Sequence, residues 1–353
     1  MNNNKLVMAF MLMGLSTGVQ AGEWVNAPVQ KVFKNWQVTC NNVNDCDVRN
    51  TDKTLRIILK RQAGAEAQPS LSFQQWAALK ADGIWLDGQA WSSDIQIATP
   101  QSSDEHVVGS SDKLAVIQAW VTQAKNAQTI AFSAGPESAS LEGLTAALLL
   151  VDERQGRLDN QTALLKVGDK PSSAVLPRPA PVALNFPVPA VVPLTDPAAL
   201  VDGAIAANGK LLKQLQCPQD EDTRARSYAE PLNDAQALVM VNCGPGDFKT
   251  LNVVFISERD NPKDTRRLTL PLPLNGTDGK PMQETMFAQG GYDSAVGHLY
   301  FSDRGNEAAE CGNNGGWIYD GKTFHLARFK NQPGCNGGQP ADWPSVWVTE
   351  GKE

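Results

Sequence analysis

The side chains best suited to chemistry in this 353-residue chain are six cysteines, which fall into three pairs of neighbours. Zinc binding is disfavoured, because the chain has no C-x-x-C spacing and only three histidines to complete a site. An even number of cysteines in an exported chain instead indicates disulfides, and the N-terminal residues of this chain indicate export. Sequence alone permits many pairings. We predict pairing between neighbours, because each pair brackets one plausible hairpin or loop: Cys40 with Cys46, Cys217 with Cys243, and Cys311 with Cys335.

The three histidines are not placed where a catalytic base is expected. His325 alternates with Phe324 and Leu326 in a predicted strand, so its side chain faces away from theirs and is expected at the surface. His298 begins another predicted strand, and His106 lies in a polar segment beside two acids. None of the three is therefore assigned a catalytic role.

Carboxylates can act in pairs, as in glycoside hydrolysis, where their separation in space decides the mechanism. The densest acidic groups are Asp152-Glu153 at the end of a predicted helix and Asp220-Glu221-Asp222 in a predicted loop. Runs of acids are usually solvated faces, so no catalytic residue is predicted among them. The sequence leaves open whether the chain is an enzyme and favours a non-catalytic role.

The sequence lacks the common motifs that indicate a catalytic site or a bound cofactor. It contains no G-x-S-x-G elbow, no H-E-x-x-H, no phosphate-binding glycine loop and no dinucleotide fingerprint. Two oxygen-rich turns, residues 275–279 and Asp45-Cys46-Asp47, could hold calcium, but neither fits the loop of an EF-hand. We therefore predict no cofactor and no metal.

Trp343 and Trp347 are the candidate binding residues. Indoles bring large apolar areas that are normally buried with the ring N–H bonded, and we expect these two to cover a nearby sheet. Because they lie around Pro344, they could also form a stacking surface for sugar rings or peptides.

The sheet that these indoles cover is predicted from residues 310–335. Residues 317–319 and 323–326 are rich in aromatic and β-branched types, and Asp320-Gly321 between them supplies the positive φ angles of a tight hairpin turn. Cys311 and Cys335 flank this hairpin, so a disulfide can close its open ends.

Residues 1–21 predict a secretory signal peptide that is cleaved after Ala21. Lys5 is followed by an apolar run from Leu6 to Leu15 and then by small residues. This run is too short to span a bilayer, and no later segment is long and apolar enough to do so. We expect a periplasmic protein without a transmembrane segment.

The net charge of the chain limits the classes of partner that it can bind. The formal net charge is −7, and loss of the one lysine in the signal peptide takes it to −8. An acidic chain with no basic stripe disfavours nucleic acid, whereas electrostatic steering favours a cationic protein as partner. An envelope protein or a glycan is the predicted partner class, and the oligomeric state stays open.

The length of the chain predicts two domains, since one core seldom serves so many residues. Residues 170–197 are rich in proline and alanine and predict an extended linker, part of which lies along one domain. We therefore divide the mature chain into an N-terminal domain at 22–169, this linker, and a C-terminal domain at 198–353.

The two domains are predicted to differ in class. The first reads as α+β: an antiparallel sheet, a helix capped by Asp112 with Leu114 and Ile117 on its buried face, and a second helix capped by Ser140. The second reads as mostly β and stapled by disulfides, after an opening helix that starts at Asp196 or Pro197.

Several motifs occur in the order seen in one known family. FKNWQVTC, SLEGLTAALLLVDERQGRLDNQTALLKVG, LVMVNCGPGDF, ECG, W-x-Y-D-G-x-x-F-x-L and DWP-x-x-W together resemble the exported proteobacterial domain-of-unknown-function 1176 family over nearly all of the mature chain. The resemblance implies no activity. Through its F-x-x-W-x-x-x-C opening, the first domain more weakly resembles the invasion-associated locus B proteins.

Two functions of different class remain. The first is a non-catalytic binding or envelope-maintenance protein, which binds a cationic protein or a glycan. The alternative is a cell-wall-directed hydrolase that uses a pair of carboxylates outside any recognised motif.

Overall fold

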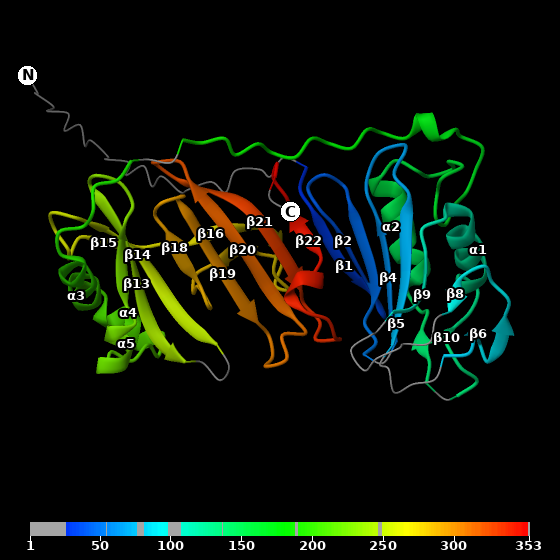
Figure 1. Cartoon of the computed structure of the whole chain (residues 1–353), viewed down its shortest axis with the longest axis horizontal. Coiled ribbons are helices and arrows are strands. Elements are labelled where there is room, and N and C mark those ends of the chain that lie inside the picture. The colour runs from blue at the N-terminus through cyan, green and yellow to red at the C-terminus, as the bar shows by residue number, and fades with distance from the viewer. Residues whose placement is uncertain are drawn as a thin grey trace, which may run out of the picture.

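Two halves of the chain lie side by side, and strands dominate both of them (Figure 1). The computed structural model describes residues 26–53, 55–75, 81–97, 107–135, 137–187, 190–245 and 249–351. The predicted signal peptide and His106 lie outside these described residues. Among the helices that are described, none combines the length and the apolar character needed to cross a bilayer.

The first half is built on a seven-stranded antiparallel sheet with the order β1-β2-β3-β4-β5-β9-β8. The strands of this sheet are β1 (Val29–Phe33), β2 (Trp36–Cys40), β3 (Cys46–Asn50), β4 (Leu55–Arg61), β5 (Pro69–Gln75), β9 (Val107–Ser111) and β8 (Gln96–Ile97). A smaller sheet has the order β11-β10-β6-β7. Its strands are β11 (Ala139–Ser140), β10 (Thr129–Ala131), β6 (Ile84–Leu86) and β7 (Gln89–Trp91).

Two helices, α1 (Leu114–Ala124) and α2 (Leu144–Arg154), pack on one face of the seven-stranded sheet. Both were predicted, but the residues that precede them differ from the prediction. Lys113, not Asp112, is the cap of α1, and Ser140 belongs to β11. Gly143 precedes α2 with a φ of 102°, and a Cβ there would collide with the carbonyl oxygen of Phe33. The first half thus has the sheet and two helices of the α+β prediction, with strands predominating.

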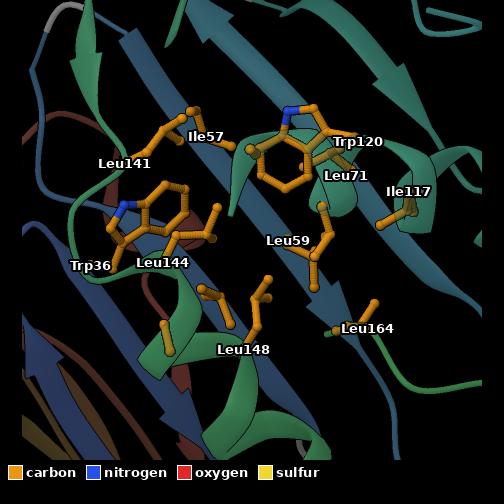
Figure 2. Close-up of a cluster of buried hydrophobic side chains, with 14 of the residues drawn as sticks. Trp36, Ile57, Leu59, Leu71, Ile117, Trp120, Leu141, Leu144, Leu148 and Leu164 are labelled. Atoms are coloured by element: carbon orange, nitrogen blue, oxygen red, sulfur yellow. The ribbon is translucent and has the colours of Figure 1, made fainter. Parts of the chain in front are cut away.

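The core of the first half lies between these helices and the sheet (Figure 2). Trp36 from β2 and Trp120 from α1 are completely buried, as is Leu148 from α2. The indole N–H of Trp36 donates to the carbonyl of Ser140 at 3.1 Å, which satisfies its buried polar atom. Each such side chain stabilises the fold by about 1.5–3 kcal/mol relative to an exposed position.

The opposite face of β2 and β3 is polar and yet buried. Gln37, Thr39, Asp47 and Arg49 alternate with core residues, and their exposed fractions are 1%, 0%, 8% and 3%. The second face of an antiparallel sheet usually meets water. Here the C-terminal segment of the second half covers it.

Hydrogen bonds hold this seam between the halves together. Arg49 forms an ion pair with Asp47, with Nη2 2.6 Å from Oδ2, and donates to Gln332 Oε1 at 3.3 Å and to the carbonyl of Asp342 at 3.0 Å. Further hydrogen bonds across the seam join Gln30 with Asn331, Asn42 with Val348, and Asn336 with Asn50. The halves therefore meet through matched polar groups and not through an apolar core.

The second half fits the mostly β prediction. One sheet has the order β12-β13-β14-β15, another β18-β19-β20-β21-β22, and β16 pairs with β17 alone. The strands of these sheets are β12 (Tyr228–Pro231), β13 (Gln236–Pro245), β14 (Thr250–Glu258), β15 (Thr265–Arg267), β16 (Leu270–Asn275), β17 (Pro281–Glu284), β18 (Gly291–Asp293), β19 (His298–Arg304), β20 (Gly312–Tyr319), β21 (Phe324–Gln332) and β22 (Ser345–Trp347). The helices are α3 (Pro197–Ala207), α4 (Gly209–Gln214) and α5 (Glu221–Ala225).

Strand β13 carries apolar side chains on both faces, because it lies between two layers. Leu238 and Met240 join the cluster of the β18 to β22 sheet, whereas Val239 and Val241 pack with α3. The predicted start of α3 is confirmed: the Asp196 carboxylate accepts the backbone N–H of Ala199 at 3.0 Å. Figure 1 shows the resulting layers, with helices α3 to α5 at one end of the molecule and α1 and α2 toward the other.

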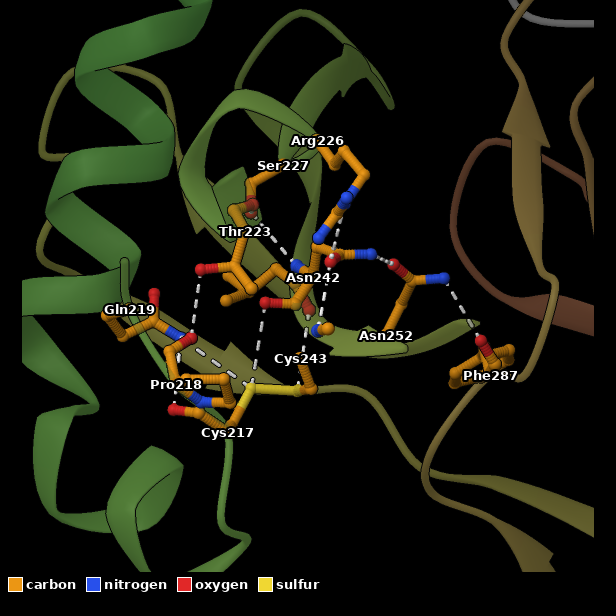
Figure 3. The surroundings of a disulfide bond; sticks show 12 residues. Cys217, Pro218, Gln219, Thr223, Arg226, Ser227, Asn242, Cys243, Asn252 and Phe287 are labelled. Carbon is orange, nitrogen blue, oxygen red and sulfur yellow. Dashed lines mark hydrogen bonds between the residues drawn. A yellow bond between two sulfur atoms is a disulfide. The ribbon is translucent and has the colours of Figure 1, made fainter. Parts of the chain in front are cut away.

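Three disulfides join the cysteines predicted as neighbours. Cys40 and Cys46 are directly opposite one another in β2 and β3. Cys217 follows α4 and is joined to Cys243 in β13 (Figure 3), beside buried Asn242, whose side chain donates to Asn252 Oδ1 at 3.1 Å. The third disulfide closes the open ends of the β20–β21 hairpin, as predicted.

The turn of that hairpin is longer than the sequence predicted. Residues 320–323 separate the strands, and of Asp320 and Gly321 only the glycine has a positive φ, of 98°. The Asp320 carboxylate accepts the backbone N–H groups of Lys322 and Thr323, both at 2.8 Å. A side-chain-stabilised turn therefore replaces the expected two-residue turn.

The described residues of the proline-rich connector, 170–187 and 190–197, lie along both halves, whereas the sequence predicted that part of the connector lies along one (Figure 1). Its contacts with the first half include that of Arg178 with Asp45, and its contacts with the second half include those of Val182 with Glu350, Phe186 with His325, and Val192 with Arg259. The extended connector thus fastens the two halves along one side of the molecule.

Removing the guanidinium of Arg49 is expected to weaken the seam. Arg49→Ala leaves Asp47 buried without its closest partner, so we expect the free energy of unfolding to fall by about 3 kcal/mol in urea denaturation. Glu142→Ala is the control, since Glu142 pairs with Lys34 at the surface, where the two side chains are 65% and 70% exposed. That change is expected to cost less than about 1 kcal/mol. Equal losses in the two variants would contradict the structural role of the buried pair.

Candidate functional site

A pocket of about 460 Å³ lies at the seam, with walls from both halves. We call it the seam pocket. Its polar walls are formed by Asn41, Gln62, Gln68 and Ser70 from the first half and by Ser345 from the second. A cavity of this size at a junction between two units is a usual location for a small-molecule site.

The turn between β2 and β3 shapes one end of the seam pocket. Asn41 Oδ1 accepts the backbone N–H groups of Val43 and Asp45, both at 3.0 Å, and the Cys40–Cys46 disulfide closes the hairpin below the turn. Because this turn is held by both a side chain and a disulfide, the residues that it presents to the pocket have fixed positions.

Two aspartates line the seam pocket, and each is already engaged by an arginine. Asp45 accepts from Nε and Nη2 of Arg178 at 2.9 and 2.7 Å. Asp47 accepts from Nε and Nη2 of Arg49 at 2.7 and 2.6 Å. The sequence offered Asp45-Cys46-Asp47 as a calcium turn, and the structure instead gives both carboxylates bidentate arginine partners. Within the described residues no group of three or more metal-ligating side chains is found.

Lys60 from β4 and Lys330 from β21 place ammonium groups on the two walls of the seam pocket. The Lys60 side chain is 54% exposed, and its Nζ lies 3.8 Å from Asp47. Lys330 Nζ donates to the carbonyl of Ala341 at 3.0 Å. Burial, together with the charges of Arg328 and Lys60, lowers the pKa of Lys330, and this outweighs the opposite influence of Asp342. The two lysines thus line the same pocket, one from each half.

Neither predicted binding tryptophan offers an open stacking surface. Trp343 is 2% exposed and Trp347 5%, so both serve the core, as one part of the sequence analysis expected. The Trp347 N–H donates to the carbonyl of Leu326 at 3.1 Å. Trp343 lines the seam pocket, and its shielded indole N–H has no acceptor among the described residues. A binding role for the two remains a prediction, and of the two Trp343 is the one beside this pocket.

His325 serves the contact with the connector. Its Nε2 lies 2.8 Å from the Asp320 carboxylate, and its ring centroid is 4.5 Å from that of Phe186. Burial acts to raise the pKa of Asp320, but the backbone N–H of Thr323 and the hydrogen bond with His325 outweigh it and lower the pKa to about 2. His298 is half-buried beside Tyr300. Neither histidine lines the seam pocket.

The first aspartate of each acidic run singled out in the sequence has a structural role. Asp152 is completely buried and accepts the backbone N–H groups of Leu164 and Leu165 at 2.8 and 2.9 Å. Burial raises the pKa of Asp152 in spite of these hydrogen bonds. Asp220 caps α5 by accepting the N–H of Thr223 at 2.9 Å. These carboxylates hold the fold together and do not gather in the seam pocket.

Glu284 at the end of β17 was not singled out by the sequence. Its carboxylate accepts the backbone N–H of Met286 at 3.2 Å, and Asp303, which pairs with Lys249, lies nearby. Burial raises the pKa of Glu284 to about 7, and the charge of Asp303 acts in the same direction. Neither carboxylate lines the seam pocket.

Sequence reasoning missed the residues that distinguish the seam pocket. Lys60 and Lys330 are 270 positions apart in the chain, and no spacing rule relates them. One signal was present: Trp36–Cys40 and Cys46–Asn50 alternate apolar and polar residues, which indicates a sheet with a polar second face. That a second half covers this face cannot be read from the alternation.

Comparison with known proteins finds a family and a relative that extend over most of the chain. The family described as "Protein of unknown function (DUF1176)" matches residues 30–350. The uncharacterized protein YpfG of Escherichia coli (strain K12) is 33% identical over 340 residues, which cover 92% of this chain and 94% of YpfG. No solved structure matches the chain. The resemblance to the 1176 family is confirmed, whereas that of the first half to the invasion-associated locus B proteins finds no support.

The raised pKa of Glu284 predicts a pH dependence of stability. Between about pH 4.5 and pH 7 the folded state binds more protons than the unfolded state, so this residue makes stability fall as the pH rises. Glu284→Gln removes the effect while keeping an oxygen for the Met286 N–H. We expect the variant to be more stable than the native chain by about 3 kcal/mol near pH 8 and equally stable near pH 4.

Denaturation of Glu284→Gln and the native chain across this pH range measures the difference. Glu142→Gln, at an exposed position, serves as control and should follow the native chain throughout. If Glu284→Gln has the same free energy of unfolding as the native chain at every pH, the Glu284 carboxyl does not have a raised pKa in the folded state.

Proposed function

The chain belongs to the DUF1176 family, whose description gives no activity. From the geometry of the seam pocket we propose that the protein binds a saccharide in this pocket without cleaving it. The observation that carries this proposal is a pocket of about 460 Å³ with polar walls contributed by both halves. Pockets for drug-like ligands are lined mainly by apolar groups, so a polar lining favours a ligand rich in hydroxyl and amide groups.

The hydrogen-bonding groups of the pocket suit a sugar. Gln62 and Gln68 provide amides, and Ser70 and Ser345 provide hydroxyls, whereas the amide oxygen of Asn41 is already bound by the β2–β3 turn. Amides and hydroxyls can both donate and accept, as the hydroxyls of a sugar require. The volume suits a fragment of about two sugar rings, within the usual range for ligand pockets.

The proposed compartment is the periplasm, where envelope glycans are accessible. Three disulfides among the described residues are compatible with an exported protein, because such bonds persist in oxidising compartments. A predicted signal peptide at residues 1–21 supports the same assignment.

The pocket supports the alternative function, hydrolysis of the cell wall, less well than it supports binding. Two aspartates do line it, but Asp45 and Asp47 are each bound by an arginine, which leaves both carboxylates engaged in the fold. A cationic protein is also disfavoured as the occupant of this pocket, because Lys60 and Lys330 lie on its walls. The formal net charge of the chain is −7, so a cationic partner would bind at another face of the molecule.

Filling the pocket tests the proposal. Isothermal titration of the native chain with soluble two-ring fragments of bacterial cell-wall glycan is expected to show binding. Ser70→Trp, at an exposed strand position on the pocket wall, is expected to weaken it by tenfold or more. Ser173→Trp, at an exposed position outside the pocket lining, is the matched control and should bind as the native chain does.

Two results would contradict the proposal. One is the absence of binding to any of the fragments, and the other is equal binding by Ser70→Trp and the native chain. New reducing ends released during incubation with intact cell wall would favour the hydrolase instead.

A further inference from the structure

The charges around the seam pocket do not balance within the pocket. Its acids, Asp45 and Asp47, each have a bidentate arginine partner. Arg61 also lines the pocket, but it is 2% exposed and donates to the carbonyl of Thr162 at 2.6 Å. Besides this buried guanidinium, the cationic groups that line the walls are the ammonium groups of Lys60 and Lys330.

The surroundings of the two lysines leave them able to take a further acceptor. Lys330 donates to a neutral carbonyl, that of Ala341, and the described residues supply it no ion pair. Lys60 lies 3.8 Å from Asp47, a carboxylate that Arg49 already holds at 2.6 Å, so this pairing is long and shared. An ammonium has three donors, and neither lysine uses all of them in these contacts.

The two lysines come from different halves of the molecule. Lys60 lies on β4, directly opposite Asp47 of β3, and Lys330 lies on β21, opposite Ser345 of β22. Because like charges repel across a partly buried pocket, an anion placed between them removes a repulsion as well as adding two charge-assisted hydrogen bonds. A planar carboxylate offers two oxygens and can accept from both sides at once.

We propose that the saccharide bound in the seam pocket carries a carboxylate, which Lys60 and Lys330 bind from opposite walls while the amides and hydroxyls of the pocket bind the sugar ring. This inference rests on the proposed function and deepens it by assigning the ligand class. It also gives the ligand a structural consequence, because each lysine belongs to a different half and the carboxylate joins them.

The test compares an acidic and a neutral disaccharide of the same length. The probes are the disaccharide of N-acetylglucosamine and N-acetylmuramic acid, which carries one carboxylate, and N,N′-diacetylchitobiose, which carries none. Isothermal titration with the full chain is expected to show about tenfold tighter binding of the acidic probe. That preference should shrink with added salt, because the charges lie near solvent.

Variants test whether Lys60 and Lys330 cause the preference for the acidic probe. Lys60→Gln and Lys330→Gln should each bind the acidic probe about tenfold more weakly, so that the preference over the neutral probe is lost, whereas Lys60→Arg should retain it. Lys31→Gln, an exposed lysine on β1 of the same half, is the control and should bind as the native chain does. Since Lys60 is more than half exposed, its replacement is not expected to disturb folding.

The outcomes separate this inference from the proposed function. Equal binding of the two probes, unaffected by the lysine variants, would overturn the carboxylate and leave saccharide binding intact. Absence of binding by both probes would overturn both proposals. Inorganic phosphate that competes as well as the acidic disaccharide would show a site for any anion and would overturn the saccharide as ligand.

Discussion

The buried ion pair between Asp47 and Arg49 is the contact on which the arrangement of this molecule depends. Both residues lie on the polar face of the seven-stranded sheet, and both are less than a tenth exposed. A charge removed from water needs a matched partner, so this face is stable only while its hydrogen bonds are complete. The second half completes them, with Gln332 and the carbonyl of Asp342 as the acceptors of Arg49.

The same seam produces the pocket. Where the two surfaces match closely, polar groups pair directly, as between Gln30 and Asn331. Where they diverge, beside the β2–β3 turn, a polar cavity remains with Lys60 on one wall and Lys330 on the other. The connector strengthens the arrangement from outside, because Arg178 binds an aspartate of the pocket and Phe186 packs on His325 of the second half. A ligand in the pocket would therefore contact groups that the fold has already fixed in position.

Local signals in the sequence predicted the parts of this fold, and contacts between distant residues decided the rest. The disulfide partners are neighbours in the chain, and α3 begins at the Asp196 carboxylate, which accepts an N–H only three residues later, so both could be predicted. The start of α2 could not, because Gly143 is required by the approach of Phe33, 110 positions earlier. The seam has the same origin: the alternation around Gln37 and Arg49 reveals a polar face, but its covering comes from residues about 300 positions later. The burial of Trp343 and Trp347 was expected from the size of their indoles, but the position of Trp343 beside a pocket depends on residues of the first half and could not be predicted.

The seam contacts imply a fixed relation between the two halves, which a distance measurement across the seam can test. Spin labels on exposed positions of each half, such as Glu66 and Lys322, can be read by double electron–electron resonance. A seam closed by a complete set of buried polar contacts predicts a single narrow distribution of distances in the ligand-free chain. A broad distribution, or two separate ones, would mean that the halves move freely and would contradict the account.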